Sequence, residues 1–334
     1  MDESLGVTVE GRAPALATLH VNERAARIAD AMAGDADALG ISVSTLAGGA
    51  RLLDCGISVP GGLEAGRLLA EACMGGLGRV DVLPWEADGV RLPGVHVRTD
   101  HPAVSCLAAQ YAGWAIRPEG YFAMGSGPLR AIARVEEELF AALGYGEPPD
   151  GRGVLVLETR ALPDGDVAAW VAAKAGMPAS ALTFLAAPTA SPAGGVQISA
   201  RVVETALHKL LHLGFDVRRI ASASGSAPLA PVAKNDLRAI GRTNDCVLYG
   251  GVVHLTVLAE DDELRELAAR LPSSASPDHG APFFDLFQRY GGDFYKVDPG
   301  LFSPAEVHLT SAASGRTFSA GGRDVGVLRR SLLS

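Results

Sequence analysis

One segment of the sequence places several ionisable side chains at helical spacing. Residues 194–216 predict a single amphipathic helix with one apolar face. At 100° per residue, Arg201, Glu204, His208 and His212 fall within about 80° of one another on the opposite face. A guanidinium, a carboxylate and two imidazoles in one row could bind a ligand or catalyse a reaction.

This row has three interpretations. It could be a solvated helix face with an Arg201–Glu204 ion pair, worth a few tenths of a kcal/mol. His208 and His212 have the spacing of helical zinc ligands, but Lys209 stands where a metalloprotease helix carries its glutamate, and no third ligand is evident. The third is a metal-free acid–base site, in which Glu204 activates water and Arg201 positions it. Spacing alone does not choose among them.

Two Gly-Ser segments belong to a weak internal repeat. Residues 109–131 and 210–231 each predict a helix ending at a glycine, an aromatic residue, a strand and a Gly-Ser-small-Pro-Leu loop. The loops, at 125–129 and 225–229, lack the Lys-Ser/Thr of a P-loop. They are either ordinary turns or anion sites for a ligand tail. The repeat predicts a duplicated fold.

Predicted helices and strands alternate along the chain, which favours an α+β (mixed α/β) fold. Residues 146–153, rich in Gly and Pro, predict a linker. We therefore expect two similar domains, 1–148 and 149–334, with the catalytic helix in the second and with segments able to cross over. The active site is expected in the cleft between them. Strands are predicted, among other places, at 50–59, 153–158, 245–257 and 305–310.

The composition excludes several classes of protein. Of 334 residues, 48% are hydrophobic and 20% charged, which excludes a disordered chain. A net charge of −9 argues against nucleic-acid binding. The sequence predicts neither a secretory signal nor a membrane span, so we expect a cytoplasmic protein. Four separated cysteines without CxxC spacing predict buried, reduced thiols.

Several longer blocks, in order, carry a more specific signal. They include LLDCGI (52–57), CMGGLG (73–78), QYAGW (110–114), YFAMGSGPLRA (121–131) and QISARVVETALHKL (197–210), followed by residues 225–251 and 282–307. With these blocks the chain resembles the methenyltetrahydromethanopterin cyclohydrolase family over nearly its whole length. High Ala, Gly and Arg usage favours a bacterial, methylotroph-type member.

The resemblance implies a cytoplasmic hydrolase that opens the cyclic amidine of 5,10-methenyltetrahydromethanopterin with water, giving the formyl derivative, in one-carbon (formaldehyde oxidation) metabolism. It also implies a metal-free site that needs no cofactor, because the pterin is the substrate, and a homotrimer. The family's catalytic arginine and glutamate stand three residues apart, and the RVVE string carries them to Arg201 and Glu204. Tyr111 stands where archaeal relatives often have lysine.

The substrate contacts follow from the chemistry of a pterin. Its planar ring needs apolar walls, for which Tyr111, Trp114 and Phe302 are candidates. The tail is expected to contact Ser126, Gly127 and Lys234. Two alternatives stay open on the same scaffold: a pterin- or anion-binding protein without turnover, and a zinc hydrolase using His208 and His212.

Overall fold

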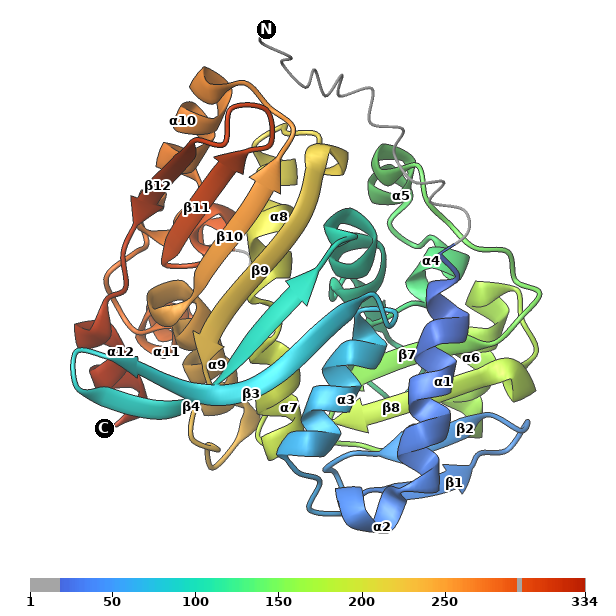
Figure 1. Cartoon of the computed structure of the whole chain (residues 1–334). Helices are drawn as coiled ribbons and strands as arrows, with labels where there is room; N and C mark the ends of the chain where they lie inside the picture. Colours follow the sequence, from blue (N-terminus) through green and yellow to red (C-terminus); the bar gives the residue numbers. More distant parts are fainter. Residues whose placement is uncertain (1–18, 293–295, 334) are drawn as a thin grey trace, which may run out of the picture.

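The computed structural model describes residues 19–292 and 296–333 and contains two six-stranded mixed sheets (Figure 1). The first sheet runs in the order β1 (Ser42–Thr45), β2 (Arg51–Asp54), β8 (Leu182–Ala187), β7 (Gly153–Glu158), β6 (Ala123–Ser126), β5 (Trp114–Ile116). The second runs β12 (Thr317–Gly321), β11 (Glu306–Ser311), β10 (Val252–Val257), β9 (Ile220–Pro228), β4 (Val90–Thr99), β3 (Gly78–Ala87). The mixed α/β class expected from the sequence is confirmed.

Each sheet takes strands from both parts of the chain. β3 and β4 precede residue 148 but pair in the second sheet, where β4 is antiparallel to β9. β7 and β8 follow residue 148 but pair in the first sheet, where β8 is parallel to β2. The division of strands between the sheets therefore does not follow the boundary at 148/149, and the segments cross over.

The helices pack on both faces of the first sheet and on one face of the second. They are α1 (Val21–Gly34), α2 (Ala36–Leu39), α3 (Leu63–Cys73), the π-helix η2 (Ala103–Gln110), α4 (Arg130–Ala133), α5 (Glu137–Leu143), α6 (Gly165–Ala175), α7 (Pro192–Ser199), α8 (Val202–His212), α9 (Asp236–Gly250), α10 (Asp261–Arg270), α11 (Phe283–Arg289) and α12 (Val325–Leu332). Short 3-10 turns are η3 (Ala179–Ala181), η4 (Val217–Arg219), η5 (Ser273–Ala275) and η7 (Pro299–Leu301). In the described part of the chain, no helix has the length and apolar character needed to cross a membrane.

Side chains point alternately to the two faces of each sheet, as the two-residue period of a strand requires. In β7, Val154 and Val156 face α1 and α3, whereas Leu155 and Leu157 face α6. In β10 the alternate residues Val253 and Leu255 are buried under the helices, and the residues between them are not buried. The first sheet is therefore covered on both faces, and the second presents a polar outer face.

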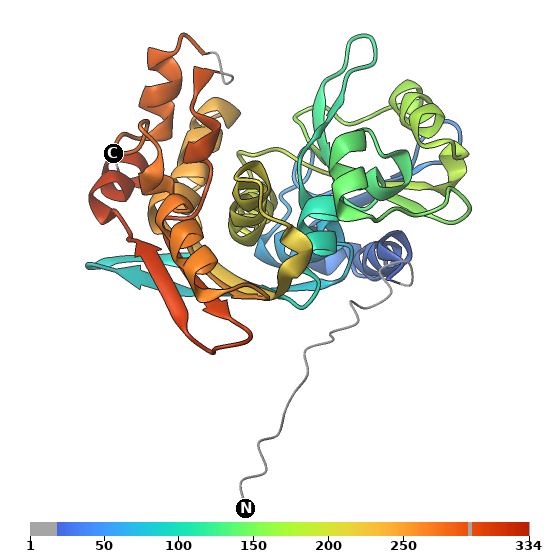
Figure 2. The same ribbon diagram turned by 90° about the horizontal axis from the view of Figure 1, so that it is seen from above.

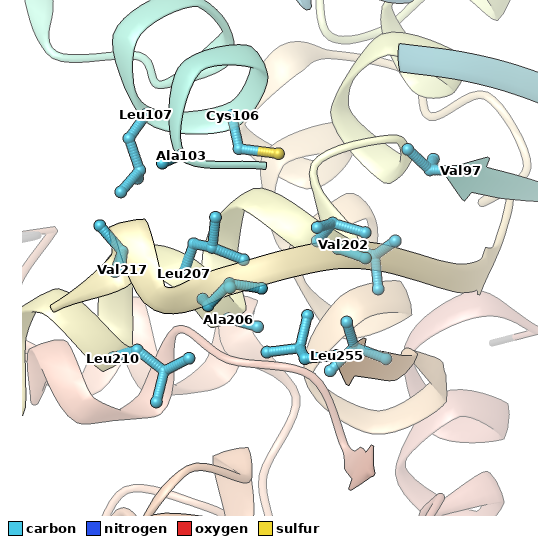
Figure 3. Close-up of a cluster of buried hydrophobic side chains, with 14 of the residues drawn as sticks. Val97, Ala103, Cys106, Leu107, Val202, Ala206, Leu207, Leu210, Val217 and Leu255 are labelled. Carbon is cyan, nitrogen blue, oxygen red and sulfur yellow. The ribbon is translucent and has the colours of Figure 1, made fainter. Parts of the chain in front are cut away.

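α8 lies between the second sheet and η2. Its residues Val202, Ala206 and Leu207 join Cys106 and Leu107 of η2 and strand residues such as Leu255 in one buried cluster (Figure 3). Seen from above, the olive segment that holds α7 and α8 runs between the two sheets (Figure 2). The segment with the ionisable row therefore sits at the centre of the molecule.

Three local predictions were wrong. The single helix over 194–216 is two helices, α7 and α8, with a break at Ala200–Arg201. The strand over 245–257 is mostly the end of α9, because a short apolar run fits a buried helix as well as a strand. The segment predicted as a loop at 225–229 is a strand as far as Pro228, because β9 continues through it.

Gly225 lies in this part of β9. An added Cβ on Gly225 would lie 3.0 Å from Val202 Cγ1, so the glycine lets α8 approach the sheet.

Close packing of α3 on α7 predicts the outcome of one substitution. A Cβ added at Gly66 would lie 2.8 Å from Ala193 Cα and 2.8 Å from Val196 Cβ. Gly66→Ala should therefore destabilise the protein by about 1–3 kcal/mol through overpacking, measured by chemical denaturation. The matched control is Gly195→Ala in α7, where nothing lies within 4 Å of the added Cβ. It should be neutral or stabilise by about 0.5–1 kcal/mol, and equal effects of both variants would contradict the packing argument.

Candidate active site

The break between α7 and α8 places Arg201 at the N-cap of α8. Its guanidinium Nη1 donates to the main-chain carbonyl oxygen of Gln110 at 2.6 Å, and its Nη2 donates to Ser126 Oγ at 3.1 Å. Gln110 is the last residue of η2, and Ser126 is the last residue of β6. Arg201 is thus held by the ends of two elements that lie 91 and 75 residues before it in the chain.

Glu204 lies one turn further along α8 and is 4% exposed. Its Oε2 is 3.9 Å from Arg201 Nη1, which is an ion pair but too long for a hydrogen bond. Burial raises the pKa of Glu204 to about 7, while the charges of Arg201 and then Arg130 oppose the rise. The solvated-face interpretation was therefore wrong for these two residues, because both are buried.

Tyr111 lies near the same pair, since the charges of Glu204 and Arg201 both act on its hydroxyl. Its ring stacks on His208 with centroids 4.7 Å apart, and the guanidinium carbon of Arg130 is 5.1 Å from the ring centroid. The Glu204 charge contributes, after burial, to raising the pKa of the Tyr111 hydroxyl. Burial lowers the pKa of His208, which favours its neutral imidazole at pH 7. The structure thus brings together Arg201, Glu204 and Tyr111.

A buried polar network continues from Ser126. Cys73 Sγ lies 3.3 Å from Ser126 Oγ, and Gln197 Nε2 donates to Cys73 Sγ at 3.5 Å. The next residue after Ser126, Gly127, donates its N–H to the carbonyl oxygen of Ala109 at 2.8 Å, beside Gln110. Ser126 is therefore bonded to Arg201, and Gly127 is the next residue along the chain; contact of either residue with a substrate tail stays a prediction.

The other predicted contact residues lie elsewhere. Lys234 is exposed in the loop before α9. Phe302 packs edge-on against Phe283 at 5.6 Å, in a cluster with α9, α11 and α12. Trp114 is buried in the core of the first sheet, with its ring centroid 6.4 Å from that of Trp170. Their roles in binding stay predictions.

The structure also identifies site residues that the sequence analysis did not single out. Arg130 is fully buried, and Gln110 supplies the carbonyl that holds Arg201. Both stand inside blocks that carry the resemblance, GSGPLRA and QYAGW, and an arginine in an apolar block was a usable signal. Gln110 acts through its main chain, so its side-chain type could not have shown this role.

The two histidines of the zinc interpretation differ in their surroundings. His208 is stacked on Tyr111, whereas His212 is exposed at the end of α8. Within residues 19–292 and 296–333, no group of three or more His, Cys, Asp or Glu side chains is arranged to hold a metal ion. The structure thus supplies no third ligand for these histidines in the part of the chain that it describes.

The described part of the structure has a cavity away from the site and a small crevice near it, and the position of a substrate cleft stays a prediction. A cavity of about 330 Å³ lies on the outer face of the second sheet, lined by residues of β3, β4, β9 and β10. A much smaller crevice lies beside the site, lined by Gln197 of α7, Glu158 at the end of β7 and Ala187 at the end of β8. The crevice is next to the polar network that holds Arg201.

The raised pKa of Glu204 makes protein stability depend on pH. The folded state binds this proton more tightly than the unfolded state, whose carboxyl titrates near 4.5, so the stabilisation is complete below pH 4.5 and lost as pH rises through about 7. Glu204→Gln does not titrate. The free energy of unfolding of the variant relative to the native protein should therefore be greater at pH 8 than at pH 5, by up to about 3 kcal/mol.

The measurement is urea denaturation of both proteins at the two pH values. Asp245, whose pKa burial also raises to about 7, titrates in both proteins and cancels in the comparison. An identical difference at pH 5 and pH 8 would contradict the raised pKa of Glu204.

The chain is similar to proteins that are named cyclohydrolases. The family model described as Cyclohydrolase (MCH) matches residues 20–332. A methenyltetrahydromethanopterin cyclohydrolase of Methanocaldococcus jannaschii is 42% identical, covering 94% of this chain and 98% of the relative. Proteins of the same name from Methylobacterium organophilum and Xanthobacter autotrophicus are 45% and 47% identical, covering 90% and 92% of this chain and 94% and 90% of the relatives.

Proposed function

The chain belongs to the cyclohydrolase (MCH) family of enzymes, and we propose that it hydrolyses 5,10-methenyltetrahydromethanopterin to the formyl derivative with Glu204 as the base. The observation that carries this proposal is a buried carboxylate with a pKa near 7, beside a guanidinium fixed by two other bonds. A general base works best when its pKa lies near the working pH. Perturbed carboxyls of this kind are concentrated at functional sites.

The reaction needs few groups because the substrate is already activated. The methenyl carbon lies between two ring nitrogens that share a positive charge, so water can attack it directly. As the new C–O bond forms, Glu204 takes one proton from the water, which gives a neutral tetrahedral adduct. When the adduct collapses, the protonated Glu204 returns the proton to the departing ring nitrogen and one C–N bond breaks. The hydroxyl proton of the adduct goes to solvent, so a cation and water give the neutral formyl product and one proton.

Arg201 has a positioning role in this scheme. Its Nη1 and Nη2 are already bonded to Gln110 and Ser126, so it faces Glu204 as a charge 3.9 Å away. That charge keeps a larger fraction of Glu204 ionised at neutral pH than burial alone would allow. Attraction between Glu204 and the substrate cation favours binding, but by itself it does not raise kcat.

The proposed substrate contacts differ in their support: some lie near the Arg201–Glu204 pair, and others rest on the resemblance. Tyr111 is proposed as a wall for the pterin ring because it is partly exposed and the charge of Glu204 acts on its hydroxyl. Ser126 and Gly127 adjoin Arg201 and could contact the substrate nearby. Lys234 and Phe302 are proposed from the resemblance alone. A cofactor-free and metal-free reaction, a cytoplasmic location, a place in formaldehyde oxidation and a homotrimer belong to the same proposal.

Glu204→Gln should lower kcat by roughly 10²–10⁴-fold, because the amide cannot accept the proton of the attacking water. Turnover is followed as loss of the methenyl chromophore at catalytic protein concentration. In the native protein, kcat/KM should fall as pH drops through about 7, where Glu204 becomes protonated. The matched control is Glu266→Gln, an exposed carboxyl of α10, which should leave both the rate and the profile unchanged.

Near-normal turnover by Glu204→Gln would reject Glu204 as the base. A native protein that changes the chromophore only in proportion to its own concentration would instead be a pterin-binding protein without turnover.

The metal-free part of the proposal has its own test. We expect no stoichiometric zinc in the purified protein and no inhibition by a chelator, because His208 is held against Tyr111. Elemental analysis and the same chromophore assay measure both. Bound zinc at one equivalent, lost together with activity in His208→Asn, would overturn the proposal in favour of a zinc hydrolase.

A further inference from the structure

Arg130 is buried more completely than either member of the Arg201–Glu204 pair. It is 0% exposed and lies at the start of α4. Its Nε donates to Glu136 Oε1 at 2.9 Å, and Glu136 is partly exposed at the start of α5. Burying a guanidinium costs free energy of folding unless it is hydrogen-bonded, so the partners of Arg130 indicate its role in the structure.

The remaining hydrogen bonds of Arg130 are to the end of η2. Its Nη1 lies within hydrogen-bond distance of the carbonyl oxygens of Leu107 at 3.0 Å, Ala109 at 3.2 Å and Ala108 at 3.4 Å. The last carbonyls of a helix lack partners within the helix and carry partial negative charge. Arg130 therefore caps the C-terminal end of η2.

That end of η2 is what holds Arg201. The next residue, Gln110, accepts the bond from Arg201 Nη1 at 2.6 Å through its carbonyl and donates its side-chain Nε2 to the Ala200 carbonyl at 3.1 Å. The residue after it, Tyr111, lies with its ring 5.1 Å from the Arg130 guanidinium carbon. A displacement of the η2 end would move the acceptor of Arg201 and the ring beside Glu204 together.

We propose that Arg130 is a positioning residue for the Arg201–Glu204 pair, acting through the end of η2 and through its positive charge. The inference rests on the proposed function, in which that pair carries out the hydrolysis. Glu136 forms an ion pair with Arg130, so its negative charge offsets part of the electrostatic effect of Arg130 on Glu204.

The charged and titratable groups around Glu204 make the electrostatic part testable. Arg201 and Arg130 lower its pKa, against burial. The Glu204 charge in turn raises the pKa values of Tyr111 and of Cys106 in η2. His208 follows Glu204 by four residues on α8, and burial lowers its pKa. Loss of the Arg130 charge should therefore raise the pKa of Glu204, and loss of the Glu136 charge should lower it.

The experiment measures the Glu204 titration directly, without substrate, by NMR of protein labelled with ¹³C at the glutamate carboxyl, with the signal assigned by its absence in Glu204→Gln. Arg130→Gln should raise the midpoint, and Glu136→Gln should lower it. Arg130→Lys keeps the charge and should return the midpoint to the native value. The matched control is Glu137→Gln, the exposed neighbour of Glu136, which should leave it unchanged.

The geometric part is measured by kcat above pH 8, where Glu204 is ionised. Arg130→Lys should lower kcat about tenfold although the midpoint is normal, because one ammonium cannot bond Glu136 and hold the carbonyls of η2 with the same geometry. A purely structural arginine would cost stability in all variants without shifts of opposite sign.

An unshifted midpoint in Glu136→Gln, or a midpoint in Arg130→Lys that departs from the native value, overturns the electrostatic role, and both variants decide this even if Arg130→Gln does not fold. Native kcat in Arg130→Lys overturns the geometric role. If the native protein does not bleach the chromophore, the proposed function fails, while the substrate-free titration still tests the effect of Arg130 on Glu204.

Discussion

The hydrogen bonds of the Arg201 guanidinium are the constraint on which the site depends. They join the start of α8 to the carbonyl end of η2 and to the last residue of β6, so three elements meet at one cation. Charge-assisted hydrogen bonds of this kind are stronger than neutral ones and fix direction as well as distance. With the guanidinium fixed by these two bonds, its Nη1 lies 3.9 Å from Glu204 Oε2, which is too far for a hydrogen bond.

This arrangement balances two opposing effects on one carboxyl group. Burial alone would keep Glu204 protonated, and a direct bidentate salt bridge would keep it ionised far below neutral pH. A guanidinium at 3.9 Å, with a second one further away, leaves the pKa near 7. The position of Arg201 relative to Glu204 is therefore as important as its charge. The end of η2, which Arg130 caps, and Ser126 of β6 hold Arg201 in that position.

The core around the site is built so that the elements approach closely. Gly66 lets α3 lie against α7, and Gly225 lets α8 lie against β9. The crossing of β3 and β4 into the second sheet, and of β7 and β8 into the first, ties the two sheets together through several connections. The break between α7 and α8 therefore lies where packing from both sheets restricts movement.

The sequence by itself determined the mixed α/β class, most of the strands, the family likeness and the Arg201–Glu204 pair, because periodicity and short strings are local properties. Only the tertiary structure decided that the pair is buried, that α7 and α8 are separate helices, and that Gly225 lies in a strand. It alone could connect Arg130 and the Gln110 carbonyl to Arg201, since those contacts join residues distant in sequence and involve the main chain. A pKa depends on burial and on charges brought in from other elements, so no reading of spacing along one helix could have supplied it.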